Sequence, residues 1–136
     1  MALFKPIPVM AVLAAMSGAT FAQSAPEPSI PGDFQGIWGL GAEACQAADW
    51  HNVDTLIRIG PDAVTYWESQ WRPVGVVRRL QGGRVLKHGF TCAGEGETWE
   101  IAQLWGRLAA AAGDYLVTVT PDTDQLLFYR RCDIAP

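Results

Sequence analysis

Two stretches near the ends of the chain decide its fold: DFQGIWGL, residues 33–40, and FYRRC, residues 128–132. The first places Trp38 two residues after a glycine, and the second places two arginines beside a cysteine. In a closed antiparallel barrel the first and last strands must meet, because closure removes the edges of the sheet. A guanidinium stacked on an indole contributes about 0.5–2 kcal/mol. We therefore predict that Trp38 is buried at one barrel end against Arg130 or Arg131.

The sequence between these ends alternates short β-rich runs with turn signals. GPD, QGG and PDTD each separate two such runs. This spacing is typical of an all-β barrel or sandwich, and we predict a small antiparallel up-and-down barrel of about eight strands. The runs are FQGIWGL (34–40), TLIRIG (55–60), AVTYWES (63–69), WRPVGVVRRL (71–80), RVLKHGFTC (84–92), ETWEIAQLWGRL (97–108), DYLVTVT (114–120) and QLLFYRRC (125–132).

Two segments depart from this pattern. AEACQAADW, residues 42–50, is rich in alanine and has no β-branched residue, so it predicts a short helical turn after the first strand. IAQLWGRLAAAAG, residues 101–113, fits both a helical stripe and strand alternation. Because Gly106 would weaken a helix at its middle, we favour a long strand that ends near Leu108.

The first 22 residues have the layout of a cleavable signal peptide, with Lys5, a short apolar run and small residues before a cut after Ala22. The apolar run is too short for a permanent membrane anchor. Three prolines in residues 23–32 predict a flexible lead-in, and residues 33–136 then form a single domain. We therefore expect the mature protein to lie in the periplasm or to be secreted.

Charge limits the choice of partners. The chain has 14 acidic and 10 basic residues, for a net charge of −4, and loss of Lys5 with the leader makes it −5. A basic face is needed to bind nucleic acid or an anionic membrane, so neither is expected. No cofactor motif is present, and the oligomeric state is left open.

The ends of the chain resemble the lipocalin and calycin superfamily, in which a Gly-x-Trp on the first strand packs beneath a basic residue of the last. The matching positions are Gly36 and Trp38 with Arg130 or Arg131. A longer pattern, GIWG…C, YWES, CAGEGETW and YRRC, resembles a group of short secreted proteins of Gram-negative bacteria. That resemblance implies a periplasmic address and a small barrel, and it implies no reaction.

Three cysteines in an oxidising compartment leave one unpaired. Members of the secreted group carry a further cysteine where this chain has Trp71. If Gln81 and Gly82 form a two-residue loop, Cys92 faces Trp71; if Gly82 and Gly83 form it, Cys92 is diagonal to Trp71. Cys92 therefore lacks the partner that the resemblance implies. Barrel closure brings the ends of the first and last strands together, so we predict a Cys45–Cys132 disulfide and a free, unreactive Cys92 thiol.

Aromatic and polar side chains on the predicted strands are the candidates for binding. Tryptophans with a few polar anchors line small-molecule pockets, although they also fill the interior of small barrels. We predict a non-catalytic barrel that binds a small apolar ligand or a protein partner. The candidate binding residues are Trp67, Glu68, Trp71, His88, Trp99 and Arg130.

An enzyme is the alternative. Glu68 and the glutamates of GEGETWE, residues 94–100, provide the paired carboxylates that a glycan hydrolase requires. No nucleophile motif and no phosphate loop is present, so we assign no catalytic residue. His51 follows Asp49 in a predicted loop, and neither His51 nor His88 has a second ligand at regular spacing, so we assign no metal site.

Overall fold

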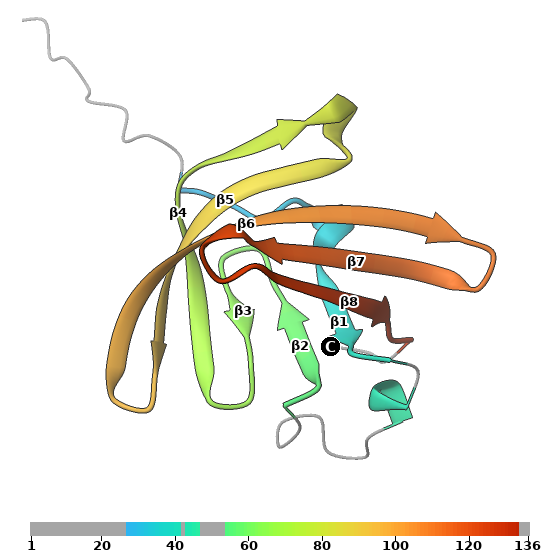
Figure 1. The fold of residues 1–136 in the computed structure, drawn as a ribbon, viewed down its shortest axis with the longest axis horizontal. Helices are drawn as coiled ribbons and strands as arrows, with labels where there is room; N and C mark the ends of the chain where they lie inside the picture. Colours follow the sequence, from blue (N-terminus) through green and yellow to red (C-terminus); the bar gives the residue numbers. More distant parts are fainter. Residues whose placement is uncertain (1–26, 42, 47–53, 134–136) are drawn as a thin grey trace, which may run out of the picture.

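The protein is a closed antiparallel β-barrel of eight strands, which confirms the predicted fold class (Figure 1). The computed structural model describes residues 27–41, 43–46 and 54–133. Each strand pairs with its neighbours in sequence order, and β8 pairs with β1. The strands are β1 (Gly36–Gly39), β2 (Leu56–Ile59), β3 (Val64–Thr65), β4 (Ser69–Leu80), β5 (Val85–Gly94), β6 (Glu97–Ala110), β7 (Gly113–Thr120) and β8 (Gln125–Arg131).

The helical content of the described residues is four short 3-10 turns. They are η1 (Gly32–Phe34), η2 (Ala44–Gln46), η4 (Gln81–Gly83) and η5 (Pro121–Thr123). The helical turn expected after the first strand is η2, while the rest of its predicted range, residues 47–50, lies outside the described residues, as do the predicted signal peptide, Asp49 and His51. No helix in the described ranges is long and apolar enough to cross a membrane.

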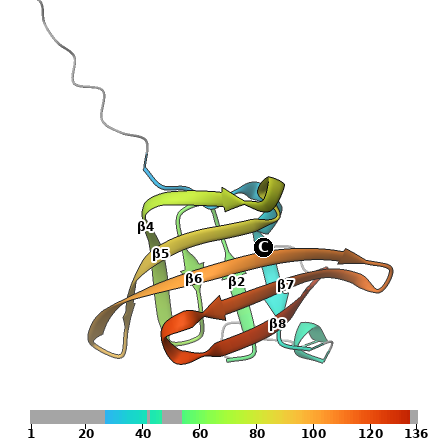
Figure 2. The ribbon, with the colours of Figure 1, turned by 45° about the horizontal axis from the view of Figure 1, so that its top comes forward.

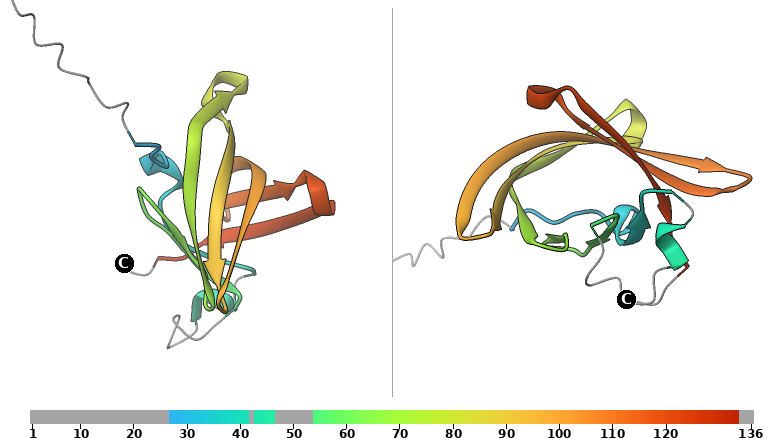
Figure 3. Two further views of the ribbon diagram at one scale, coloured as in Figure 1. Left: turned by 90° about the vertical axis from the view of Figure 1, so that its left-hand side faces the viewer. Right: turned by 60° about the horizontal axis from the view of Figure 1, so that its bottom comes forward.

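The barrel has a long-stranded side and a short-stranded side. Strands β4 to β8 have 7–14 residues each, whereas β1, β2 and β3 have four or fewer. In Figure 2 the long strands cross the molecule in sequence order, and in Figure 3 they arch over β1–β3. Residues 101–110 belong to β6, so the preference for a strand in this segment is confirmed.

Closure depends on few residue pairs. Strand β8 meets β1 at Trp38↔Arg131 and Gly39↔Arg130. The Cys132 amide donates a hydrogen bond to the Ile37 carbonyl, with an N···O distance of 2.9 Å. The predicted disulfide follows at once: Cys45 and Cys132 are bonded, with their Cα atoms 5.2 Å apart. Cys92 is free and buried, as predicted.

The Gly-x-Trp motif has a steric explanation. Trp38 is completely buried, and the guanidinium carbon of Arg131 lies 4.1 Å from the centre of its ring, as predicted. Gly36 has φ +133°, and a Cβ atom there would lie only 2.7 Å from Arg131 Nη1. A side chain at this position would therefore strain the backbone and push the guanidinium away from its place on Trp38. Arg131 also donates hydrogen bonds to the carbonyl groups of Gln35 (2.6 Å) and Asp33 (2.8 Å).

Arg130 has a different position from Arg131. Adjacent residues of a strand point to opposite faces of the sheet, so Arg131 faces the barrel interior and Arg130 faces outward. Of the two predicted alternatives, Arg131 and not Arg130 is therefore the residue that packs against Trp38. Arg130 instead lines a shallow outer cleft of about 380 Å³ beside the β6–β7 turn.

The hairpin around QGG differs from both predicted loops. Leu80 pairs with Val85, so the connection has four residues, Gln81 to Arg84. A bulge between Val74 and Arg78 then shifts the register, and Cys92 does face Trp71. The prediction that Cys92 lies beside Trp71 is confirmed, but both predicted two-residue loops of this hairpin are wrong. Consecutive positive φ angles at Gln81 (49°), Gly82 (67°) and Gly83 (90°) lengthen the turn.

Aromatic rings form a continuous column through the core. Tyr66 packs on Trp71 with 4.4 Å between ring centres, and Trp71 packs on Phe90 at 5.8 Å. Trp105 follows at 5.5 Å from Phe90, and Phe34 of η1 ends the column at 6.2 Å from Trp105. The lumen is thus occupied by side chains along the barrel, which is the structural role that small barrels give to tryptophan.

Replacing Trp38 with alanine removes the largest side chain of the closed end. We expect Trp38→Ala to lower the free energy of unfolding by about 3–5 kcal/mol, because a buried ring is lost and a cavity remains. Urea unfolding followed by circular dichroism measures this loss. Trp67→Ala is the matched control, since Trp67 is 50% exposed and its loss should cost less than about 1 kcal/mol. Equal losses in the two variants would contradict the closure role of Trp38.

Candidate functional site

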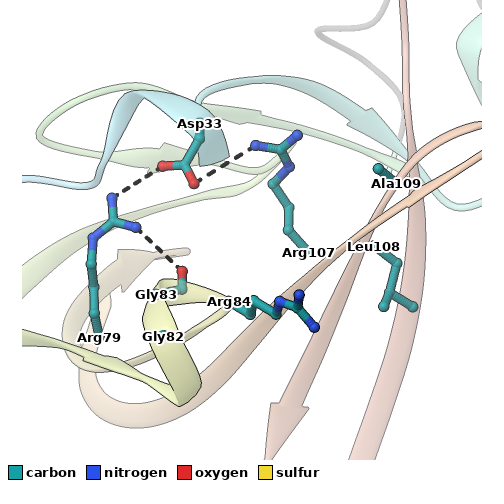
Figure 4. Close-up of a pocket in the computed structure, with 8 residues that line it drawn as sticks. All are labelled: Asp33, Arg79, Gly82, Gly83, Arg84, Arg107, Leu108 and Ala109. Carbon is teal, nitrogen blue, oxygen red and sulfur yellow. Dashed lines mark hydrogen bonds and ion pairs between the residues drawn. The ribbon is translucent and has the colours of Figure 1, made fainter.

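A cleft walled by arginines lies at the closed end of the barrel (Figure 4). Its volume is about 610 Å³. Asp33 of η1 lies across from Arg79, and Arg107 reaches toward the same carboxylate from another strand. The lining residues are Asp33, Arg79, Gly82, Gly83, Arg84, Arg107, Leu108 and Ala109.

Strand register brings these arginines together from distant parts of the sequence. Arg79, near the end of β4, pairs with Leu86 of β5, which is fully buried. Because paired residues point to the same face of a sheet, both side chains point toward the barrel interior. Arg107 of β6 is paired with the buried Leu116 in the same way. The Arg107 amide donates to the Arg84 carbonyl at 3.3 Å, which places Arg84 beside it. The cleft therefore lies at the rim of the barrel, where the inward-facing Arg79 and Arg107 meet the β4–β5 turn.

A chain of ion pairs runs from the cleft to the closure. Asp33 Oδ1 lies 3.3 Å from Arg79 Nη2, and its Oδ2 lies 3.7 Å from Arg107 Nη1. Asp114 Oδ2 lies 3.3 Å from Arg107 Nη2 and 3.3 Å from Arg131 Nε. Each aspartate is thus shared by two arginines, and the last arginine is the one stacked on Trp38.

The cleft has more positive than negative charge. Its charged lining residues are Arg79, Arg84 and Arg107 with Asp33, while Asp114 and Arg131 continue the ion-pair chain outside the cleft. Within the described part of the chain, Arg84 has no side-chain hydrogen bond and no ion pair. Three positive charges thus face one negative charge in the cleft, although the whole chain carries −4. Concave sites with an excess of one sign attract ligands of the opposite sign.

The turn that carries Arg84 also shapes the cleft. A Cβ atom at Gly82 would meet no neighbouring atom, so space does not restrict this position. Its φ of +67° does, because glycine adopts that angle more readily than other residues. At Gly83 a Cβ atom would lie 3.4 Å from Arg79 Nη1. The same Nη1 donates a hydrogen bond to the Gly83 carbonyl oxygen, at 3.3 Å. The glycine pair therefore lets the turn approach the Arg79 guanidinium closely.

The predicted binding residues lie mainly toward the opposite barrel end. Trp71, Cys92 and Trp99 form one row across β4, β5 and β6. Trp71 is partly buried in the aromatic column, whereas Trp99 is 39% exposed at the rim. Trp67 and Glu68, in the β3–β4 connection, are exposed. Arg130 is separate from all of these, on the outer surface.

The glutamates considered for glycan hydrolysis do not line the arginine cleft. Glu68, Glu95, Glu97 and Glu100 are all exposed, in the β3–β4 connection and around the β5–β6 turn. The outer cleft beside Arg130 is lined by none of them either. A hydrolase needs its two carboxylates on either side of a bound sugar, and these four glutamates do not meet in either cleft.

His88 is buried without any hydrogen bond to its side chain. It is 2% exposed, and neither ring nitrogen has a hydrogen-bond partner. Its ring centre lies 4.3 Å from that of Phe90 and 4.3 Å from that of Trp105, with the Trp105 contact edge-on. Burial lowers the pKa of His88 to about 4 from 6.5, so the imidazole is neutral at pH 7. These apolar surroundings indicate that His88 is a core residue and does not contact a ligand.

The other polar groups of the interior satisfy one another. The Gln103 amide donates to Thr120 Oγ1 at 2.8 Å, and Trp105 Nε1 donates to Gln103 Oε1 at 2.8 Å. Burial raises the pKa of Cys92 to about 11, so the thiol stays protonated. Thiolates, not thiols, are the nucleophiles, so the prediction of an unreactive Cys92 agrees with its surroundings.

Sequence reasoning missed the arginine cleft entirely. Of its residues, only the Arg78–Arg79 pair attracts notice in the sequence, and it reads as a solvated strand face. Asp33, Arg84, Arg107 and Asp114 stand alone among apolar neighbours. The usable signal was their phase: Arg79 and Arg107 each occupy an inward position at a strand end, where a charge has to meet a partner.

Comparison of the chain with protein-family models, with curated proteins and with solved structures gave no match.

Neutral burial of His88 predicts acid sensitivity. As pH falls through about 6.5, the unfolded chain binds a proton at His88, whereas the folded chain does not until about pH 4. Stability present above pH 6.5 is therefore lost as pH falls, by about 2–3 kcal/mol at pH 4.5. We expect His88→Leu to remove this part of the loss. Urea unfolding of both proteins at pH 7.5 and 4.5 measures it, and parallel losses would contradict a neutral His88.

Proposed function

We propose that the protein is an exported, non-catalytic β-barrel that binds a small molecule carrying a multivalent oxyanion in the arginine cleft. The observation that carries this proposal is the charge of the site: three arginines line the cleft with one aspartate, Asp33 pairs with Arg79 and Arg107, and Arg84 has no ion partner in the described ranges. A ligand with two negative charges balances the remaining two positive ones. Phosphates and polycarboxylates share this chemistry.

Guanidinium groups suit such a ligand. Each presents a planar fork of N–H donors that matches a carboxylate or a phosphate, and charge-assisted hydrogen bonds are the stronger kind. Arg84 and the solvent-facing side of Arg79 supply the free donors, while Asp33 holds Arg79 and Arg107 in place. The Gly82–Gly83 turn leaves backbone within reach of a ligand. Specific contacts of this kind favour an oxyanion over chloride.

Binding in the cleft would also stabilise the closed barrel. The guanidinium of Arg131 belongs to the same ion-pair chain and stacks on Trp38. A ligand that binds only the folded chain stabilises it by about 2.7 kcal/mol at a hundred times its dissociation constant. Ligand binding would therefore be detected as a rise in the melting temperature of the protein.

A non-catalytic role is supported by the chemistry of the cleft. Its lining contains no serine, cysteine, histidine or lysine, and its one carboxylate, Asp33, is held by two arginines. Export is supported by the signal-peptide pattern of residues 1–22. The Cys45–Cys132 disulfide is in keeping with an oxidising compartment, in which such bonds persist.

Titration calorimetry and thermal melting with pyrophosphate and with citrate test the proposal on the chain without residues 1–22. We expect saturable binding of at least one anion and a higher melting temperature than in sodium chloride of equal ionic strength. Arg84→Gln should weaken binding about five- to tenfold, because one charge-assisted contact is lost. The two anions distinguish a phosphate ligand from a polycarboxylate.

Arg78→Gln is the matched control for Arg84→Gln. It removes the same charge from the same hairpin, but Arg78 does not line the cleft. Binding should be unchanged in this variant. Equal weakening by both substitutions would show a general charge effect, and no saturable binding of either anion would reject the oxyanion site.

A further inference from the structure

An uncovered apolar face lies on the outside of β6, β7 and β8. The register aligns the outward side chains in three rows across these strands. Only one of the nine positions is charged. The rows are Leu104, Val119 and Leu126; Gly106, Val117 and Phe128; and Leu108, Tyr115 and Arg130.

This face is exposed, whereas the outer apolar residues of β1 and β2 are buried. Leu108, Leu126 and Phe128 are 55%, 53% and 55% exposed. On the other side of the barrel, Ile37 and Leu56 also point outward, yet η2 and the disulfide bury them. The chain thus covers one outer apolar face itself, and no element among the described residues covers the second. Contiguous exposed apolar surface of this kind marks an interaction site.

Strand β8 also has an unpaired edge beside this face. It pairs with β7 from residue 125 to residue 130, but with β1 only at residues 130 and 131. The opposite edge of residues 125–129 has no partner strand in the described ranges. Unpaired N–H and C=O groups on an edge are a template for another strand. This stretch, QLLFY, has no charge, no proline and no bulge to discourage such pairing.

We propose that the β8 edge and the apolar face beside it bind a second copy of this chain. Two β8 strands can pair antiparallel about a twofold axis at Leu127, which sets Leu126 of one copy beside Phe128 of the other. Both outward side chains then leave water together, and the two β6–β8 faces become one continuous face. Because residues 125–129 are uncharged, the twofold axis brings no like charges together at the edge.

The composition of the edge favours a second copy over a different protein. A twofold interface needs a surface that complements itself, and an uncharged antiparallel edge with alternating apolar side chains does so. Leu108 borders both this face and the arginine cleft, so the test relies on other residues of the face. Leu126 and Phe128 do not line the arginine cleft, so substitutions there leave that site intact.

Light scattering after size exclusion tests the proposal on the chain without residues 1–22, across the micromolar range. We expect a species with twice the mass of the chain, and slower amide exchange of residues 125–129 as the concentration rises. Phe128→Lys should raise the dimer dissociation constant roughly tenfold or more, because the axis places two buried lysines near each other. Leu126→Lys should act in the same direction.

Val74→Lys is the matched control. Val74 is 41% exposed on the outer face of β4, so it adds the same charge to an exposed apolar position away from β8. The dimer should persist in this variant, and all variants should keep the circular dichroism of the parent. A monomer at every concentration, or equal dissociation by Val74→Lys, would overturn the proposal. Protection of residues 125–129 only after a periplasmic extract is added would assign the edge to another protein and would also overturn it.

Discussion

The stacking of Arg131 on Trp38 is the contact on which the rest of the barrel depends. Two residue pairs join β8 to β1, so the backbone alone gives closure little support. The guanidinium adds the ring contact at 4.1 Å and two hydrogen bonds to carbonyls of the segment that enters β1. Gly36 suits this contact because its φ of +133° is rarely adopted by L residues and a Cβ atom there would displace the guanidinium. The disulfide at Cys132 then fixes the next residue covalently.

The same arginine connects closure to the charged end of the barrel. Its Nε pairs with Asp114, which also pairs with Arg107, and Arg107 shares Asp33 with Arg79. Each of these pairs is partly exposed, and single pairs of that kind contribute little to stability. Their value lies in position: together they hold several guanidinium groups close to one another in a protein of net negative charge. Structure and ligand affinity would thus depend on one network.

The distribution of apolar side chains explains why binding is expected at the surface. Rings from Tyr66 to Phe34 fill the axis of the barrel, and the buried His88 stays neutral among them. The interior therefore serves packing. Exposed apolar residues instead gather outside, on β6–β8, beside a strand edge that β1 is too short to cover. The shortness of β1 is thus the origin of the open edge.

The sequence by itself determined the features that depend on local pattern or covalent chemistry. Alternation and turn residues predicted the barrel, and barrel closure predicted the burial of Trp38 and the Cys45–Cys132 bond. Only the tertiary structure decided which arginine faces inward, because strand phase depends on register and on bulges such as that between Val74 and Arg78. The arginine cleft and the open β8 edge were likewise decided by the tertiary structure. The cleft combines side chains of η1, β4, the β4–β5 turn and β6, and the edge is open because β1 pairs with only two residues of β8. The registers that place these elements are fixed by packing across the whole barrel, not by any one segment.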